Sequence, residues 1–228
     1  MKPIVIASNM WNERAQLPEW FDFVGKIADS GILIVDSGST DGTIEYAESR
    51  GAVVVVDDII QKEGYGPARN HLRTMSRKHF PDAHWMMYLD ADERILPEEF
   101  HRLRFIKDYL IPNYDVVALP RIDWFDKEMT AAAKDWKIYP DWQARMTRLD
   151  SSVRYIRRLH EQVDSFKGIY NDLQSPKIHH FHRSAGKEKR DVIGKLCAKL
   201  HREDEYGSTY PEHPKESFYR ELYDKEGL

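Results

Sequence analysis

The first hundred residues of this 228-residue chain alternate between short apolar runs and segments with a helical pattern. The apolar runs lie at 3–7, 32–36, 53–56 and 84–89, and the helical segments between them at 17–28, 43–49 and 68–78. Apolar runs joined by helices predict βαβ units and a mostly parallel sheet. Each run ends in polar residues, and open α/β sheets bind ligands beyond the carboxyl ends of their strands. We therefore expect a ligand crevice at that edge of the sheet.

The regular alternation stops after the fourth apolar run. The sequence predicts a helix over 98–110 and a strand over 116–120, followed by short strands and loops rich in aromatic and charged residues. A basic amphipathic helix is predicted over 187–202. We expect one α/β domain over residues 1–183, followed by a helical extension and an acidic tail over 184–228.

The net charge of −4 is distributed unevenly along the chain. Residues 137–202 carry an excess of eight positive charges, whereas residues 1–136 and 203–228 carry excesses of seven and five negative charges. A basic segment suits an anionic partner such as a phosphorylated lipid, a nucleic acid or a nucleotide. A solvated face without a partner would have the same composition.

Nothing in the sequence resembles a membrane span or a secretory signal. No apolar run approaches the roughly 18 residues of a spanning helix, and the run near the N-terminus is too short for a signal core. The single cysteine, Cys197, agrees with a reducing compartment. We expect a cytoplasmic protein without a transmembrane segment, with peripheral attachment at the inner membrane surface as the alternative.

Three carboxylates, Asp90, Asp92 and Glu93, directly follow the fourth apolar run. An Asp-x-Asp tripeptide alone is weak evidence, because about two are expected by chance in so acidic a chain, and Asp92 could simply cap a helix. At the mouth of a crevice, however, two oxygen donors suit Mg²⁺ or Mn²⁺. Without a cation, a carboxylate about 4 Å from a phosphate would cost roughly 4 kcal/mol at an effective dielectric constant near 20. A carboxylate pair that faces a diphosphate therefore implies a metal ion between them.

Several segments together resemble a family 2 glycosyltransferase of the GT-A fold, most of all the branch of lipopolysaccharide-core glucosyltransferases and peptide S-glycosyltransferases. They occur in the family's order: NE at 12–13, VDSGSTDGT at 35–43, GPARN at 66–70, LDADE at 89–93, DWQARM at 141–146, HE at 160–161 and IHH at 178–180. The resemblance covers roughly residues 3–183. It implies a Rossmann-like, mostly parallel central sheet flanked by helices, with a nucleotide-binding half at 1–93 and an acceptor-side half at 94–183.

The resemblance implies transfer of a hexose or pentose from a nucleotide-diphosphate sugar, by default a UDP-sugar, with inversion at the anomeric carbon. The cofactor would be Mn²⁺ or Mg²⁺. The acceptor hydroxyl could belong to a lipopolysaccharide or polysaccharide sugar, a peptide, or a modified base of a nucleic acid such as DNA. Two alternatives are a non-catalytic nucleotide-sugar-binding scaffold, which would be expected to show broken motifs, and a nucleotidyltransferase, which would usually have a glycine-rich loop after the first strand.

Residue roles follow from the same resemblance. The donor nucleotide is expected to contact Asn12, Glu13, Asp36, Ser37, Arg69 and Asp90. Arg69 would pair with the pyrophosphate or with the Asp-x-Asp carboxylates. The metal is expected to bind Asp92 and Asp90, with a histidine as third ligand. His180 and His182 would share one face of a strand while His179 points away, and His180 is favoured by motif position.

An inverting displacement needs a general base on the acceptor side. Glu161 is the first choice, Glu93 the second and Asp141 the third. Trp142, Arg145 and His160 are expected to contact the acceptor or a phosphate.

Overall fold

The computed structural model describes residues 2–109, 114–124, 128–129, 140–171, 174–181 and 187–203. The first part contains β1 (Ile4–Met10), α1 (Leu17–Val24), β2 (Gly31–Asp36), α2 (Thr43–Ser49), β3 (Val53–Val56), α3 (Ile59–Glu63), α4 (Tyr65–His79) and β4 (Trp85–Tyr88). It is followed by β5 (Glu93–Arg94), the 3-10 turn η1 (Pro97–Glu99), α5 (Phe100–Tyr109), β6 (Val116–Trp124), β7 (Asp141–Arg148), β8 (Arg154–Ile156), β9 (Gln162–Asp164), β10 (Ile169–Tyr170), β11 (Ile178–Phe181) and α6 (Lys187–Glu203).

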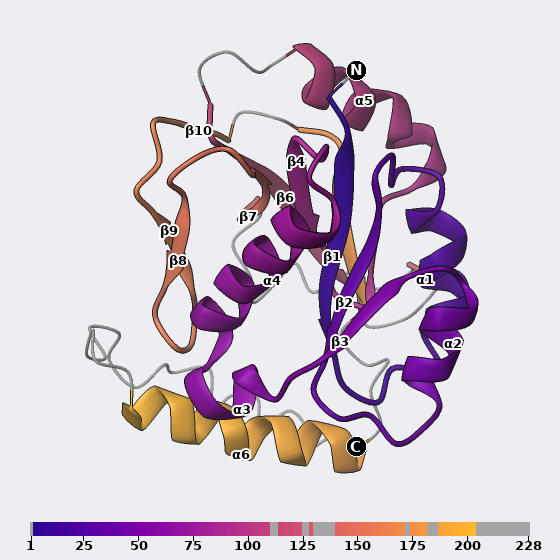
Figure 1. Ribbon diagram of the computed structural model, residues 1–228, viewed down its shortest axis with the longest axis vertical. Helices are drawn as coiled ribbons and strands as arrows, with labels where there is room; N and C mark the ends of the chain where they lie inside the picture. Colours follow the sequence, from indigo (N-terminus) through magenta and orange to yellow (C-terminus); the bar gives the residue numbers. More distant parts are fainter. Residues whose placement is uncertain are drawn as a thin grey trace.

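A nine-stranded sheet forms the centre of the molecule (Figure 1). Its strand order is β3-β2-β1-β4-β7-β6-β11-β5, and β10 pairs with the first two residues of β6, Val116 and Val117. The strands β3, β2, β1 and β4 are parallel to one another, as the alternating pattern predicts, whereas β7 is antiparallel to both β4 and β6. The carboxyl ends of the parallel strands lie at the lower edge of the sheet in Figure 1.

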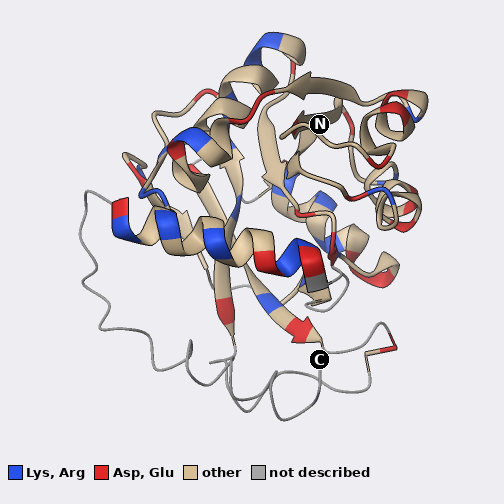
Figure 2. Ribbon diagram, turned by 90° about the horizontal axis from the view of Figure 1, so that it is seen from below, with Lys and Arg blue, Asp and Glu red and all other residues tan. Residues whose placement is uncertain are grey.

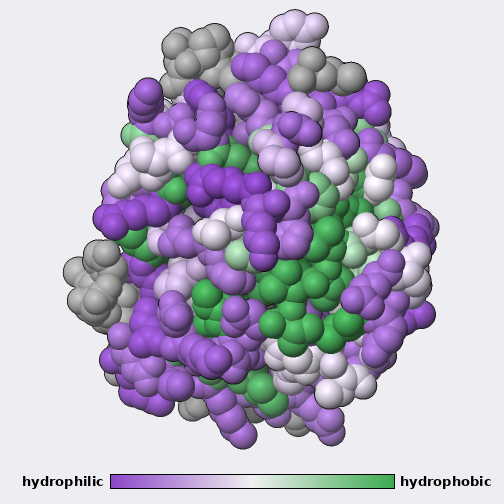
Figure 3. Space-filling view, viewed as in Figure 1, coloured by the Kyte–Doolittle hydropathy of each residue, from purple (hydrophilic) through white to green (hydrophobic). Residues whose placement is uncertain are grey.

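Helices cover both faces of the parallel strands, which explains why these strands contain runs of consecutive apolar residues. Alternate residues such as Ile4, Ile6 and Ile34 pack into one buried cluster with side chains of α1, α2 and α5. The residues between them, including Val5 and Leu33, pack with α4 on the other face. Hydrophobic residues on the face shown in Figure 3 gather over the β3 edge of the sheet, beside which the described residues form no further strand.

Helix boundaries differ from the sequence prediction around Gly64 and Gly66. Residues 59–63 form α3, and α4 begins at Tyr65 instead of Ala68. Pro67 lies in the first turn of α4, where its missing N–H has no intrahelical partner to lose. Gly64 is the single residue between α3 and α4, and its φ of +94° is a backbone conformation that favours glycine.

Helix α6 crosses the carboxyl ends of the parallel strands, and Figure 2 shows it in front of them with Lys and Arg along its length. The Lys189 ammonium donates to the Asn12 carbonyl (3.0 Å), and Glu203 at the other end pairs with Arg158 (3.2 Å). Among the described residues, no helix has both the length and the hydrophobicity needed to cross a bilayer. The predicted acidic tail after residue 203 lies outside the described residues.

Candidate active site

The loops after β1 and β2 interlock at the carboxyl edge of the sheet. Asp36 is fully buried, and its carboxylate accepts hydrogen bonds from the backbone N–H groups of Gly38 (2.9 Å) and Ser39 (2.6 Å) and from the Ser39 hydroxyl (2.7 Å). The Asn12 N–H donates to the Ser39 hydroxyl (2.7 Å), and the Asn12 side-chain oxygen accepts from the Thr40 N–H (2.8 Å). Asp36 and Asn12 therefore hold the backbone of this edge in place.

Glu13 and Ser37 lie at the same edge. The Ser37 N–H donates to the Met10 carbonyl (2.9 Å), which continues the pairing of the two strands into the loop. The Glu13 carboxylate forms an ion pair with Lys189 of α6 (2.5 Å). Burial raises the pKa of Glu13 to about 7, although Lys189 opposes this shift. The sequence prediction missed Lys189, whose only signal was its place in a basic helix.

Asp90 and Glu93, the first and third of the three carboxylates that follow β4, bond to each other in a tight turn. The Asp90 N–H donates to the Glu93 carboxylate (3.0 Å), and the Glu93 N–H donates to the Asp90 carbonyl (3.0 Å). The Tyr88 hydroxyl donates to the Asp90 carboxylate. Glu93 is fully buried and pairs with Arg145, itself only 2% exposed. Burial raises the pKa of Glu93 while the Arg145 cation opposes the rise.

These contacts change two of the expectations. Glu93 has no exposed atom, so its carboxylate cannot meet an acceptor hydroxyl, and the second choice of base is not supported. Arg145 was expected to contact the acceptor or a phosphate, but its guanidinium lies inside the protein against Glu93, at 3.5 Å from the Asp90 carboxylate. A buried carboxylate of this kind requires such a cation, because an unpaired charge is costly in the interior.

Asp92 and His180 come together from distant parts of the chain. Strand β11 lies between β6 and β5, and the Phe181 N–H donates to the Asp92 carbonyl (3.0 Å). The His180 Nε2 atom is 3.3 Å from the Asp92 carboxylate, and its Nδ1 atom bonds to the Asp123 carboxylate. Burial alone would lower the pKa of His180, but Asp92 and Asp123 raise it to about 10. Burial alone would raise the pKa of Asp92, but the neighbouring His180 lowers it below its usual value.

The neighbouring histidines differ in environment. His179 faces away from Asp92, as expected for a strand, and stacks on Trp124, whose indole N–H donates to its Nδ1 atom (2.9 Å). His182 lies outside the described residues. An imidazole nitrogen and a carboxylate oxygen that converge in this way fit Mn²⁺ or Mg²⁺. In the described part of the chain, no third Asp, Glu, His or Cys side chain completes a metal cluster, so the remaining positions would be left to donor phosphates and water.

Arg69 pairs with Glu161 instead of with the Asp-x-Asp carboxylates. Its side chain is 9% exposed and that of Glu161 17% exposed, and the guanidinium lies 3.5 Å from the centre of the Tyr88 ring. Burial would lower the pKa of Arg69, but the Glu161 carboxylate raises it above its usual value. This pair joins the start of α4 to the chain just before β9.

The contacts of the first residues of α4, Tyr65 and Gly66, explain why Arg69 and Glu161 meet. The N–H groups of Tyr65 and Gly66 donate to the carbonyls of Arg158 (2.8 Å) and Arg157 (3.1 Å). A Cβ atom on Gly66 would lie 2.3 Å from the Arg157 carbonyl oxygen, so only glycine permits this approach. The motif therefore docks α4 directly against the backbone that leads to His160 and Glu161.

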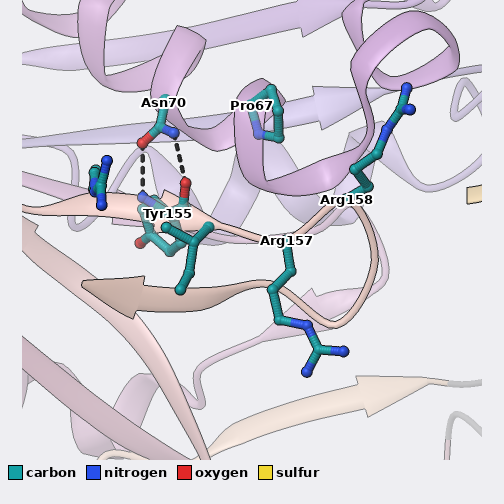
Figure 4. A pocket seen from close by; sticks show the side chains of 7 residues that line it. Pro67, Asn70, Tyr155, Arg157 and Arg158 are labelled. Atoms are coloured by element: carbon teal, nitrogen blue, oxygen red, sulfur yellow. Dashed lines mark hydrogen bonds between the residues drawn. The ribbon is translucent and has the colours of Figure 1, made fainter. Parts of the chain in front are cut away.

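Asn70, from the same motif, also holds β8. Its side chain accepts from the N–H of Tyr155 and donates to its carbonyl, both at 2.7 Å. These bonds border a pocket of about 190 Å³ whose lining consists of Pro67, Asn70, Arg154, Tyr155, Ile156, Arg157 and Arg158 (Figure 4). The guanidinium groups of Arg157 and Arg158 point in different directions, so they do not converge on one anion. Of the remaining predicted acceptor residues, His160 is exposed, with φ +53°, and Trp142 is half-buried on β7.

Comparisons with known proteins agree with this geometry. Residues 9–170 match the family model of glycosyl transferase family 2. An uncharacterized glycosyltransferase of Rickettsia bellii (strain RML369-C) is 34% identical over 95 residues, which are 42% of this chain and 29% of that protein. The chain thus spans less than a third of the length of that relative.

Two solved structures share the overall fold. S. aureus TarS is 12% identical with a TM-score of 0.53, and the similarity covers 93% of this chain and 44% of TarS. Mannosyl-3-phosphoglycerate synthase from Rubrobacter xylanophilus is 15% identical with a TM-score of 0.51, and covers 93% of this chain and 78% of that chain. Because the family model matches well over half of its residues, this chain belongs to glycosyl transferase family 2, and its sheet and helices have the GT-A fold.

Proposed function

We propose that this protein is an inverting, metal-dependent glycosyltransferase that moves a hexose or pentose from a UDP-sugar to an acceptor hydroxyl. The observation that carries the proposal is the approach of His180 Nε2 to the Asp92 carboxylate (3.3 Å) beyond the carboxyl end of β4. Ligands of open α/β sheets bind at this edge. Membership of the family supports the same chemistry.

The donor nucleotide would lie against the interlocked loops after β1 and β2. Backbone and side-chain groups of Asn12, Glu13 and Ser37 border this edge, and Asp36 supports it from below. Asp92 and His180 would hold Mn²⁺ or Mg²⁺, with Asp90 nearby for its water shell. When bound, the cation offsets the negative charge of the donor diphosphate and of the departing UDP.

Glu161 is the proposed general base. As the acceptor oxygen attacks the anomeric carbon, the hydroxyl proton passes to the Glu161 carboxylate and the bond from the sugar to UDP breaks. Arg69 orients this carboxylate through the ion pair, and Tyr88 supports Arg69 from beneath. His160 and Trp142 would border the acceptor, whose class remains a prediction: a lipopolysaccharide or polysaccharide sugar, a peptide, or a modified base of DNA.

Release of UDP from a panel of UDP-sugars with Mn²⁺, with and without acceptors, tests the proposal. We expect slow donor hydrolysis that stops with EDTA and in Asp92→Ala, and that continues in Asp150→Asn, which removes an exposed carboxylate outside the site. Glu161→Gln should retain binding of UDP and Mn²⁺ but lose transfer. Tight donor binding without turnover on a broad acceptor panel would contradict the proposal and favour a non-catalytic scaffold.

A further inference from the structure

Asp123 lies beside the Asp92–His180 pair but belongs to none of the motifs that identify the family. It is the residue of β6 that stands in register with His180 of the parallel neighbour β11. Its side chain is 3% exposed, and one carboxylate oxygen bonds to the Nδ1 atom of His180. A carboxylate from the neighbouring strand therefore contacts the imidazole from the side opposite Asp92.

The chemistry of imidazole gives this contact a specific effect. An ionised carboxylate can only accept hydrogen bonds, so the Nδ1 atom that it contacts must carry the proton. A histidine that binds a metal ion must be neutral, so the ion displaces the Nε2 proton while the Nδ1 proton stays on Asp123's side, and the lone pair of Nε2 is then available to the ion. Nε2 is the atom that faces the Asp92 carboxylate.

We propose that Asp123 is a positioning residue for a histidine that binds the divalent cation. It fixes the Nδ1–H tautomer and the ring orientation of His180, so that Nε2 and the Asp92 carboxylate bind the same ion. This inference rests on the proposed function, which places the cation at that site. Residues that orient metal-binding histidines in this way typically raise metal affinity by 10-fold to 100-fold.

A purely structural role for Asp123 would be to neutralise Arg121, which lies two residues earlier on the same strand. The distances favour the histidine instead. Arg121 Nε is 3.9 Å from the Asp123 carboxylate, whereas Arg121 makes hydrogen bonds of 2.8 and 3.1 Å to Asp141. Arg121 thus has a closer carboxylate of its own, whereas Asp123 bonds directly to the imidazole.

Binding of Mn²⁺ to the full chain, alone and with saturating UDP, tests the inference through the electron paramagnetic resonance signal of free Mn²⁺. Asp123→Asn should raise the Kd for Mn²⁺ by about 10-fold to 100-fold. Asp141→Asn is the matched control, because it removes a carboxylate from the Arg121 network without touching His180, and its Kd should stay within about twofold of wild type. Asp123→Glu, which retains a charged group that can only accept hydrogen bonds, should recover part of the affinity that the neutral amide of Asp123→Asn loses. Coupling of ¹⁵N-labelled histidine to bound Mn²⁺ should be present in wild type and Asp141→Asn, and weaker in Asp123→Asn.

The outcomes separate the two proposals. Wild-type affinity and histidine coupling in Asp123→Asn would overturn the positioning role and leave the transferase proposal intact. If the variant lowers only the unfolding temperature in EDTA, while its folded fraction binds Mn²⁺ as wild type does, Asp123 is a structural residue and the inference is wrong. If wild type itself binds no Mn²⁺ even with UDP, both the metal-dependent function and the role of Asp123 are refuted.

Discussion

Replacement of Arg69 by methionine should destabilise the protein strongly, because it leaves the Glu161 carboxylate without its cation. Exposed ion pairs contribute about 0–1 kcal/mol, but loss of one partner of a buried pair costs roughly 3–5 kcal/mol. With side chains only 9% and 17% exposed, this pair is of the buried kind. The substitution also removes the contact of the guanidinium with the Tyr88 ring at 3.5 Å. We expect Arg69→Met to lower the free energy of unfolding by about 3–5 kcal/mol.

Glu161→Gln should cost less, about 2 kcal/mol, because Arg69 keeps its stacking on Tyr88 and an amide oxygen can still accept a hydrogen bond. The decrease in the free energy of unfolding of the double variant should be smaller than the sum of the two single decreases, by about 2 kcal/mol or more. The reason is that the double variant leaves neither charge buried without a partner. Urea unfolding of the four proteins at pH 7 measures this coupling from midpoints and slopes.

The control is the exposed pair Arg154–Asp164, whose side chains are 60% and 42% exposed. Its cycle should give a much smaller coupling than the buried pair. The reasoning is refuted if the free-energy loss of the double variant equals the sum of the two single losses to within about 0.5 kcal/mol. Such additivity would show that Arg69 and Glu161 do not stabilise each other.

Three further changes have defined outcomes. Gly66→Ala should lower the free energy of unfolding by roughly 1–3 kcal/mol because its Cβ would meet the Arg157 carbonyl oxygen at 2.3 Å, whereas Gly194→Ala, in α6 with no atom within 4 Å, should raise it by about 0.5–1 kcal/mol; thermal melts compare the two. Asn70→Ala removes both 2.7 Å bonds to the backbone of β8 and should cost about 2 kcal/mol in urea unfolding, a value that a loss below a few tenths would contradict. Since burial raises the pKa of Glu13 to about 7, the folded state binds this proton more tightly than the unfolded state, and the resulting stability is complete below about pH 4.5 and lost as pH rises through 7. The advantage of wild type over Glu13→Gln in urea unfolding should therefore shrink by roughly 3 kcal/mol between pH 4 and pH 8, and a constant difference would show that Glu13 is not held in this way.

The parallel half of the sheet could be predicted because β1, β2 and β4 contribute side chains to the buried clusters on both faces, which requires runs of apolar residues. The insertion of antiparallel β7 between β4 and β6 could not, since strand order depends on pairing between distant segments. The strand predicted to end at Pro120 continues to Trp124, because β11 and β7 pair with it there. Asp123 was missed for that reason: it lies beyond the predicted end of the strand.

The partners of the site residues were harder to predict than the residues themselves. Asp92 and His180 were singled out by motif position, and the structure brings them to 3.3 Å. Arg69 was also singled out, but a local pattern does not indicate which of several carboxylates will face a guanidinium. Arg69 pairs with Glu161 because Gly66 approaches the backbone after β8 closely. Such contacts arise from tertiary packing and leave little trace in the spacing of a sequence.

The position of β11 between β6 and β5 also affects when the site can form. Asp92 leaves the ribosome long before His180, and until residues 178–181 insert between two strands already synthesised, the carboxylate has no imidazole beside it. Pairings between such distant segments form slowly, because a long loop must close first. A nascent chain that stops before Ile178 would thus carry every acidic residue of the Asp-x-Asp motif and still lack the histidine that completes the pair. If the proposed cation site exists, its ability to bind Mn²⁺ would therefore report that β11 is in place.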